Sequence, residues 1–315
     1  MAIASLFRVS ALSVIAICGL VAMDQVAPGV FVAEAVAQDK PKKDTRETRR
    51  TPALRNKVYE RLAEAQTLAE AKDYAGAAAI LNDMISEDGK RALNSYELAN
   101  VYNLHAFLSY AKEDYPQSLR YYEQVIAQPD IPLAMEINTR FTIAQLYFVQ
   151  EKWQQGIDAL LMWFEMNEKP NAGAYVLLAQ GYYQVKRYDL ALDNVETAIA
   201  MHEGEGKLPK EQWYNLARFL YFDKEDFDSA LDVLNTLIIY YPKKQYWVQA
   251  SHLYGEKKDE PRQLALMEAA YEQGFLDRSS ELVTMAYLYL NAEAPYYDGA
   301  VIEKGFSDEL VDDKS

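Results

Sequence analysis

The sequence predicts an all-α solenoid, in which helical hairpins stack one after another. Three observations favour this fold: a unit of about 34 residues recurs seven times, the copies contain two apolar stretches at helical spacing, and small and large residues follow a shared order. A chain of 315 residues, half of them apolar, can bury the elongated core that such a stack requires.

The clearest copy of the unit spans residues 172–205. One face of its first predicted helix carries Tyr175, Leu178, Ala179 and Tyr182. A short polar interruption follows, and the second helix is expected to open at Tyr188. The apolar face of that helix carries Ala191, Val195, Ala198 and Ile199. The alanines on both faces are placed where two antiparallel helices must approach closely.

This order of small and large residues resembles the tetratricopeptide repeat (TPR). The resemblance implies a TPR-like α-solenoid, a right-handed superhelix of about seven helix-turn-helix repeats, over residues 58–315. The second helix of each repeat is expected to begin near Tyr74, Tyr115, Trp153, Tyr188, Phe227 and Glu260. The glutamate stands where an aromatic residue is expected, so the sixth repeat is degenerate.

The seventh repeat is short, and the chain stops soon after it. Its first helix is predicted around Leu282 and Tyr289, and its second between Tyr296 and Phe306. A solenoid normally ends in a polar capping element, because its last apolar face would otherwise meet water. We therefore expect that the sequence is truncated at Ser315 or that a partner covers this end.

The first 37 residues have the pattern of a secretory signal peptide. Arg8 precedes an uncharged apolar run from Val9 to Ala22, and the small residues Ala35 and Ala37 precede the expected cleavage site. Cleavage would remove the only cysteine, Cys18, and would place the mature chain in the periplasm. The alternative is an uncleaved signal that anchors the chain in the membrane.

Residues 38–57 are predicted to form a basic flexible linker. From Asp39 to Lys57 there are eight Lys and Arg residues against three acidic ones, whereas the whole chain has a net charge of −15. An acidic body argues against nucleic acid as a partner, because phosphate contacts require a positive face. The linker is expected either to contact anionic lipid headgroups weakly or simply to be solvated.

The sequence indicates a protein that is not an enzyme and that needs no cofactor or metal. Its three histidines, His105, His202 and His252, are far apart, and no phosphate-binding loop, serine elbow or metal-spaced cluster accompanies them. His105 is expected to be a satisfied interior residue. The alternative is that the protein is an enzyme, an envelope hydrolase that uses Glu and His side chains in a groove of the solenoid.

The first helices of the repeats are expected to line a concave groove that binds an extended, proline-rich peptide. Aromatic rings there would bury area at little entropic cost, and polar neighbours would bond the peptide backbone. The candidate groove residues are Phe107, Tyr110, Phe141, Gln145, Phe148, Gln180, Tyr183, Arg218, Tyr221 and His252. The alternative is that these rings only pack between neighbouring helices.

A narrower resemblance concerns residues 47–62, ETRRTPALRNKVYERL, the acidic repeats that follow, and residues 263–271, QLALMEAAY. These segments are similar to periplasmic TPR proteins associated with TonB energy-transducing systems. The resemblance implies an accessory, non-catalytic component beside a complex of the TonB, ExbB and ExbD type that energises outer-membrane transport. The alternative is a TPR scaffold for outer-membrane or cell-wall assembly.

Overall fold

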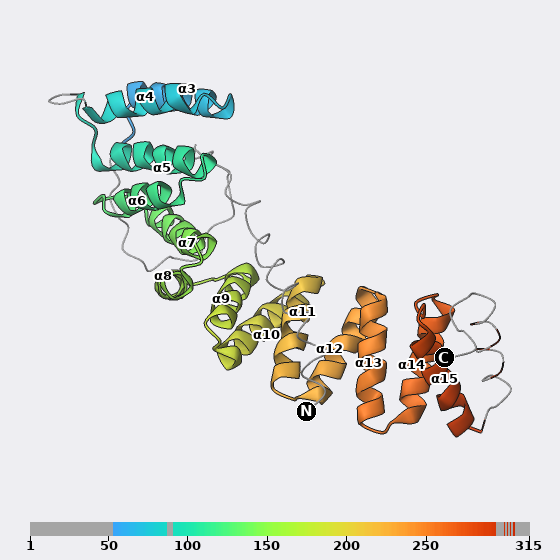
Figure 1. Ribbon diagram of the computed structural model, residues 1–315. Helices are drawn as coiled ribbons and strands as arrows, with labels where there is room; N and C mark the ends of the chain where they lie inside the picture. The colour runs from blue at the N-terminus through green and yellow to red at the C-terminus, as the bar shows by residue number, and fades with distance from the viewer. Residues whose placement is uncertain are drawn as a thin grey trace. The chain divides into compact units, whose positions relative to one another are not determined.

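The computed structural model describes residues 53–86 and 91–293, together with Gly299, Val301, Glu303 and Gly305. Within this part of the chain there are thirteen α-helices and no strand (Figure 1), so the prediction of an all-α fold is confirmed. The predicted signal segment, most of the basic linker, and all but four residues of the last predicted helix lie outside the described residues.

The helices belong to two compact units, one ending at Arg187 and the other starting at Tyr188. The first unit holds α3 (Asn56–Glu70), α4 (Tyr74–Ser86), α5 (Ser95–Ala111), α6 (Tyr115–Ile126), α7 (Leu133–Val149), α8 (Trp153–Met166) and α9 (Ala172–Gln184). The second holds α10 (Tyr188–Gly204), α11 (Glu211–Asp223), α12 (Phe227–Tyr240), α13 (Lys244–Glu256), α14 (Glu260–Glu272) and α15 (Ser279–Asn291).

The predicted start of the second helix is confirmed in the first six repeats, since α4, α6, α8, α10, α12 and α14 each begin at the expected residue. The sixth repeat keeps this start although Glu260 replaces the aromatic residue. There, the Asp259 side chain caps the helix by accepting a hydrogen bond from the Arg262 backbone N–H, and Pro261 occupies the first turn. Helix α3 begins at Asn56, two residues before the predicted start of the solenoid.

Small residues on the first helix of each repeat lie in the core, as predicted. They are at most 5% exposed: Ala65, Ala106, Ala144, Ala179, Ala217, Ala250 and Ala286. Because the side chain of alanine is only a methyl group, neighbouring helices can approach closely at these positions. In the second repeat the small residue of the partner helix is Ser118, whose buried hydroxyl donates a 2.8 Å hydrogen bond to the Ala106 carbonyl.

The turn between the two helices of a repeat uses a residue in the left-handed conformation, two positions before the second helix opens. These residues have φ between 57° and 62° and are Lys72, Glu113, Glu151, Lys186, Glu225 and Lys258. The backbone N–H of Glu113 donates a hydrogen bond to the Tyr110 carbonyl at 2.8 Å. The backbone N–H of Asp114 donates to the Ser109 carbonyl at 2.9 Å. This pair of bonds is the Schellman motif that closes α5.

A β-branched residue in this turn should be costly. We expect Glu113→Val to lower the free energy of unfolding by about 1–2 kcal/mol, because β-branched side chains clash with the backbone in the left-handed region. The matched control is Glu123→Val at an exposed site inside α6, which should cost only about 0.5 kcal/mol of helix propensity. Equal losses for the two variants in urea unfolding would contradict this account of the turn.

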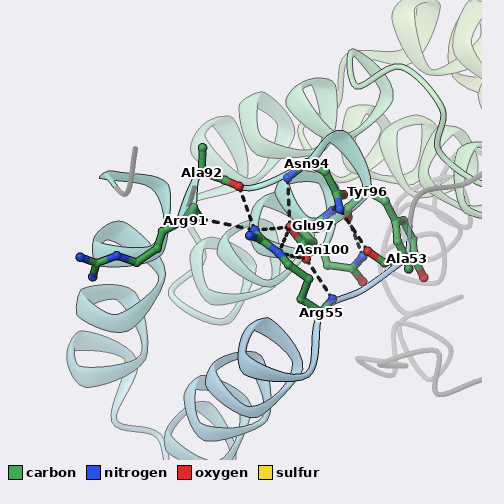
Figure 2. Close-up of polar contacts among 8 residues, drawn as sticks. All are labelled: Ala53, Arg55, Arg91, Ala92, Asn94, Tyr96, Glu97 and Asn100. Carbon is green, nitrogen blue, oxygen red and sulfur yellow. Dashed lines mark hydrogen bonds and ion pairs between the residues drawn. The ribbon is translucent and has the colours of Figure 1, made fainter. Parts of the chain in front are cut away.

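The start of the solenoid is fixed by a buried carboxylate on α5 (Figure 2). Glu97 is 0% exposed and accepts hydrogen bonds from the Arg55 backbone N–H at 3.0 Å and from the Arg55 guanidinium at 2.7–3.2 Å. Arg55 also donates to the Ala92 carbonyl at 2.8 Å, and the Asn94 amide donates to the Ala53 carbonyl at 3.1 Å. The end of the predicted linker, residues 53–57, is therefore part of the folded stack.

Candidate peptide-binding site

A pocket of about 300 Å³ lies between three consecutive helices of the second unit, α10, α11 and α12. Its apolar lining consists of Ile199, Ala200, Ala217 and Val233, and its polar lining of Glu196, Glu203, Tyr214, Tyr221, Asp232 and Thr236. The three carboxylate residues are exposed to solvent, whereas Tyr214 is only 4% exposed. The pocket therefore combines an apolar surface with an acidic rim.

Two tyrosine hydroxyls hold two of the rim carboxylates in place. Tyr214 donates to Glu203 Oε1 at 2.8 Å, and Tyr221 donates to Glu196 Oε1. Burial raises the pKa of both tyrosines, and the adjacent carboxylates raise these pKa values further. Both phenols therefore remain protonated donors at neutral pH.

A second polar cluster connects α11 with α13. The Arg218 guanidinium lies 5.5 Å from the centre of the Tyr246 ring and donates to Gln249, while Asn215 donates to the Tyr246 hydroxyl at 2.9 Å. Tyr246 in turn donates to Glu211 at 2.5 Å. Arg218 Nε and Asn215 Oδ1 are buried without a hydrogen-bond partner among the described residues. The cluster mainly joins two neighbouring repeats.

Phe148, a predicted groove residue, is buried among helices of the first unit, which favours the alternative that its ring packs within the stack. Its side chain is only 8% exposed, and its ring lies so close to Gly156 and Gly181 that a β-carbon at either glycine would be 2.9 or 2.7 Å from it. The ring also contacts the Trp153 ring, with centroids 6.2 Å apart. Phe148 therefore fills the space between α7, α8 and α9.

The other predicted rings of the first unit also make contacts within the stack. Phe107 packs against the core between α3, α4 and α5, while the Phe141 ring lies 4.8 Å from Trp163 and the Tyr110 ring 5.6 Å from Tyr115. These three residues remain partly exposed, as do Gln145, Gln180 and Tyr183. A ligand role for these six residues stays a prediction.

In the second unit the predicted residues lie in different places. Tyr221 lines the pocket, Arg218 belongs to the cluster between α11 and α13, and His252 is exposed with Nε2 3.9 Å from Glu256 Oε1. The contribution of α10 was not predicted, because the candidate residues all belong to the first helix of each repeat. The seven-residue spacing of Glu196 and Glu203 could have revealed two carboxylates on one face.

His105 is buried in the first unit, as predicted, but its side chain is not fully hydrogen-bonded. Its ring stacks on Tyr121 at 4.7 Å, and Nε2 has no hydrogen-bond partner within the part of the chain that the structure describes. Burial, helped by the nearby charge of Lys112, lowers the pKa of His105 to about 4. The imidazole is therefore neutral at physiological pH.

No group of three or more His, Cys, Asp or Glu side chains is placed to hold a metal ion in residues 53–86 and 91–293 or the four residues beyond them. Across the same part of the chain, every helix is too short or too polar to span a bilayer.

Comparison with known proteins finds similarity in structure alone. No protein-family model matches the chain, and no curated protein matches it. Similar solved structures include a tetratricopeptide repeat protein from Parabacteroides merdae ATCC 43184, with 14% identity over 82% of this chain and 94% of that one, and a TM-score of 0.47. The helical hairpins of the described residues, whose second helices begin where the repeats predict, give this part of the chain a TPR-like α-solenoid fold.

Two further structures show the same level of similarity. MamA is 18% identical over 56% of this chain and 91% of its own, with a TM-score of 0.46. YrrB, described as a TPR protein with an unusual peptide-binding site, is 14% identical over 68% of this chain and 97% of its own, with a TM-score of 0.45. At these values the similarity concerns the fold and carries no argument about function.

Proposed function

We propose that this protein is a non-catalytic scaffold that binds an extended segment of another envelope protein in the pocket between α10, α11 and α12. The observation that supports this function is the composition of the pocket, in which an apolar surface adjoins tyrosines and carboxylates. Aromatic and apolar groups can bury the side chains of an extended peptide, while the polar rim can bond its polar groups.

The narrower part of the proposal is a place in the periplasm beside a complex of the TonB, ExbB and ExbD type. Its support comes from the sequence: the signal-like residues 1–37, and the similarity of residues 47–62 and 263–271 to periplasmic TPR proteins of such systems. In this role the scaffold would hold a partner segment near the membrane, where effective concentration strengthens weak binding.

A steric block of the pocket tests the scaffold function. Ala200 is an exposed pocket residue on α10, so Ala200→Trp should fill the pocket without disturbing the core. We expect this variant to bind a fluorescent, neutral, proline-rich peptide at least fivefold more weakly than the unmodified protein, by fluorescence anisotropy, because the indole occupies the space that the peptide needs.

The control for this experiment is Ala63→Trp, at an exposed site on α3 in the other unit. It adds the same side chain and should leave peptide affinity within twofold of the unmodified protein. Equal affinities for Ala200→Trp and the unmodified protein, or no binding of any extended peptide to the unmodified protein, would contradict the proposed function.

A deletion strain tests the biological setting. A component of a TonB-type system should be required for growth on chelated iron as the iron source, and its loss should leave resistance to detergent unchanged. Sensitivity to detergent with normal growth on chelated iron would contradict the TonB assignment and would favour a scaffold for outer-membrane or cell-wall assembly.

A further inference from the structure

The pocket between α10, α11 and α12 is suited to cations. Glu196, Glu203 and Asp232 stand on its rim, and neither Lys nor Arg is among the described residues that line it. Lys224, at the end of α11, is already paired with Asp189 at 3.0 Å. Carboxylates gathered beside a low-dielectric surface concentrate their field, so the pocket should attract positively charged groups.

Two of these carboxylates are held in position before a ligand arrives. Glu196 and Glu203 each accept a hydrogen bond from a pocket tyrosine, Tyr221 and Tyr214 respectively. A carboxylate offers about four lone-pair sites, so each glutamate can still accept hydrogen bonds from a cationic ligand. Because the tyrosines already restrict these side chains, less conformational entropy is lost when the ligand binds.

The spacing of the two glutamates selects the conformation of the ligand. They are seven residues apart on α10, which places them on one face and about 10 Å apart along the helix axis. In a polyproline II segment, side chains three residues apart share a face and are about 9 Å apart. Same-face neighbours in a β-strand are only about 7 Å apart. The rise between the two glutamates is therefore closer to the spacing of every third residue in a polyproline II segment than to that of same-face residues in a β-strand.

The chain contains a segment with this pattern between its signal-like residues and its helices. Cations recur at every third residue: Lys40, Lys43, Arg46 and Arg49. Pro41 follows the first of them, and the residue before a proline is restricted to extended backbone conformations. This segment is the most basic part of a chain whose net charge is −15, so it is complementary to the pocket in charge as well as in spacing.

We propose that the basic segment, residues 39–52, of a second copy of this chain occupies the pocket between α10, α11 and α12, so that the protein associates with itself. The assignment rests on the proposed function, since it uses the same pocket for an extended segment. It adds that the occupant is basic and that a partner protein must displace it.

Binding of a synthetic peptide tests the occupant. A fluorescent peptide of residues 39–52 should bind the purified full chain at low salt, at protein concentrations where the chain is monomeric. A peptide of equal composition with its cations grouped at one end should bind at least threefold more weakly. Equal affinity for the two peptides, or no binding of the 39–52 peptide, would overturn the proposal.

Removal of carboxylate charges from the pocket tests whether the peptide binds there. The double variant Glu196→Gln with Glu203→Gln keeps an acceptor for each tyrosine and should bind the 39–52 peptide at least fivefold more weakly. Glu123→Gln with Glu165→Gln removes two exposed charges from the other unit and should stay within twofold of the unmodified protein. Equal losses in both double variants would show non-specific attraction to an acidic body and would overturn the assignment to this pocket.

Sedimentation of the full chain tests whether the basic segment comes from a second copy of the chain. The mass of the unmodified protein should rise with concentration, and the pocket double variant should remain monomeric over the same range. A mass independent of concentration would overturn self-association. Binding of neutral proline-rich peptide without binding of the 39–52 peptide would overturn this inference alone, whereas failure of both peptides would also remove the proposed function.

Discussion

Replacing Phe148 by alanine is expected to lower the free energy of unfolding by about 3–5 kcal/mol, because the ring is buried and its removal leaves a cavity between α7, α8 and α9. Chemical denaturation followed by circular dichroism measures this loss. The control is Met162→Ala on α8, where the side chain is 53% exposed and truncation should cost less than about 1 kcal/mol. Equal losses for the two variants would show that Phe148 does not fill the core.

A double-mutant cycle tests the contact itself. A β-carbon at Gly181 would lie 2.7 Å from the Phe148 ring and 2.9 Å from Ile157, so Gly181→Ala should destabilise the protein through overpacking. In the Phe148→Ala background the clash with the ring is gone and only the contact with Ile157 remains, so Gly181→Ala should destabilise the protein less. The control is Gly204→Ala, where no atom lies within 4 Å of the added carbon. Additive effects of the two substitutions would contradict the proposed packing.

The second large effect is expected at the start of the solenoid. Arg55→Ala should cost about 2–4 kcal/mol, because it leaves the fully buried Glu97 carboxylate without its charged partner. Arg61→Ala on the same helix is the control, since Arg61 pairs with the exposed Asp83 and should contribute at most about 1 kcal/mol. Similar unfolding free energies for the two variants would contradict the role of Arg55.

The same ion pair predicts a pH dependence. Burial raises the pKa of Glu97, but the hydrogen bonds from Arg55 and Asn94 and the Arg55 charge outweigh burial, so the pKa lies below its usual value of 4.5. A carboxyl group with a lowered folded-state pKa contributes stability above its unfolded-state pKa and loses it as the pH falls through the folded-state pKa. Arg55→Ala should therefore lose less stability than the unmodified protein between neutral pH and the acid range.

Much of the fold could be predicted from the sequence because the signals are local. A small residue in the middle of each first helix and an aromatic residue at the opening of each second helix determine where the chain turns. The helix that starts at Glu260 was also predicted, although the aromatic residue is missing, because the repeat period fixes its position. Residues 53–57 were assigned to the linker, since the contact between Arg55 and Glu97 spans 42 residues and leaves no local pattern.

The site was predicted less well because it depends on the contacts between helices. Phe148 and Tyr221 have equivalent positions in their repeats, yet one fills a space left by Gly156 and Gly181 and the other lines a pocket. In the first case the absence of a side chain at Gly156 on α8 and Gly181 on α9 leaves room for the ring. The glutamates of α10 were missed because the concave groove was assigned to the first helices alone, whereas the pocket also uses the helices that flank α11.

Cross-linking most directly tests the claim that the pocket between α10, α11 and α12 holds an extended segment. A photoreactive residue at the centre of the bound proline-rich peptide would be activated, and the modified positions read by mass spectrometry. The account predicts cross-links to residues of these three helices, around Ala200 and Val233, and their loss in Ala200→Trp. Cross-links at α8, around the exposed Leu161 and Met162, that persist in that variant would contradict it.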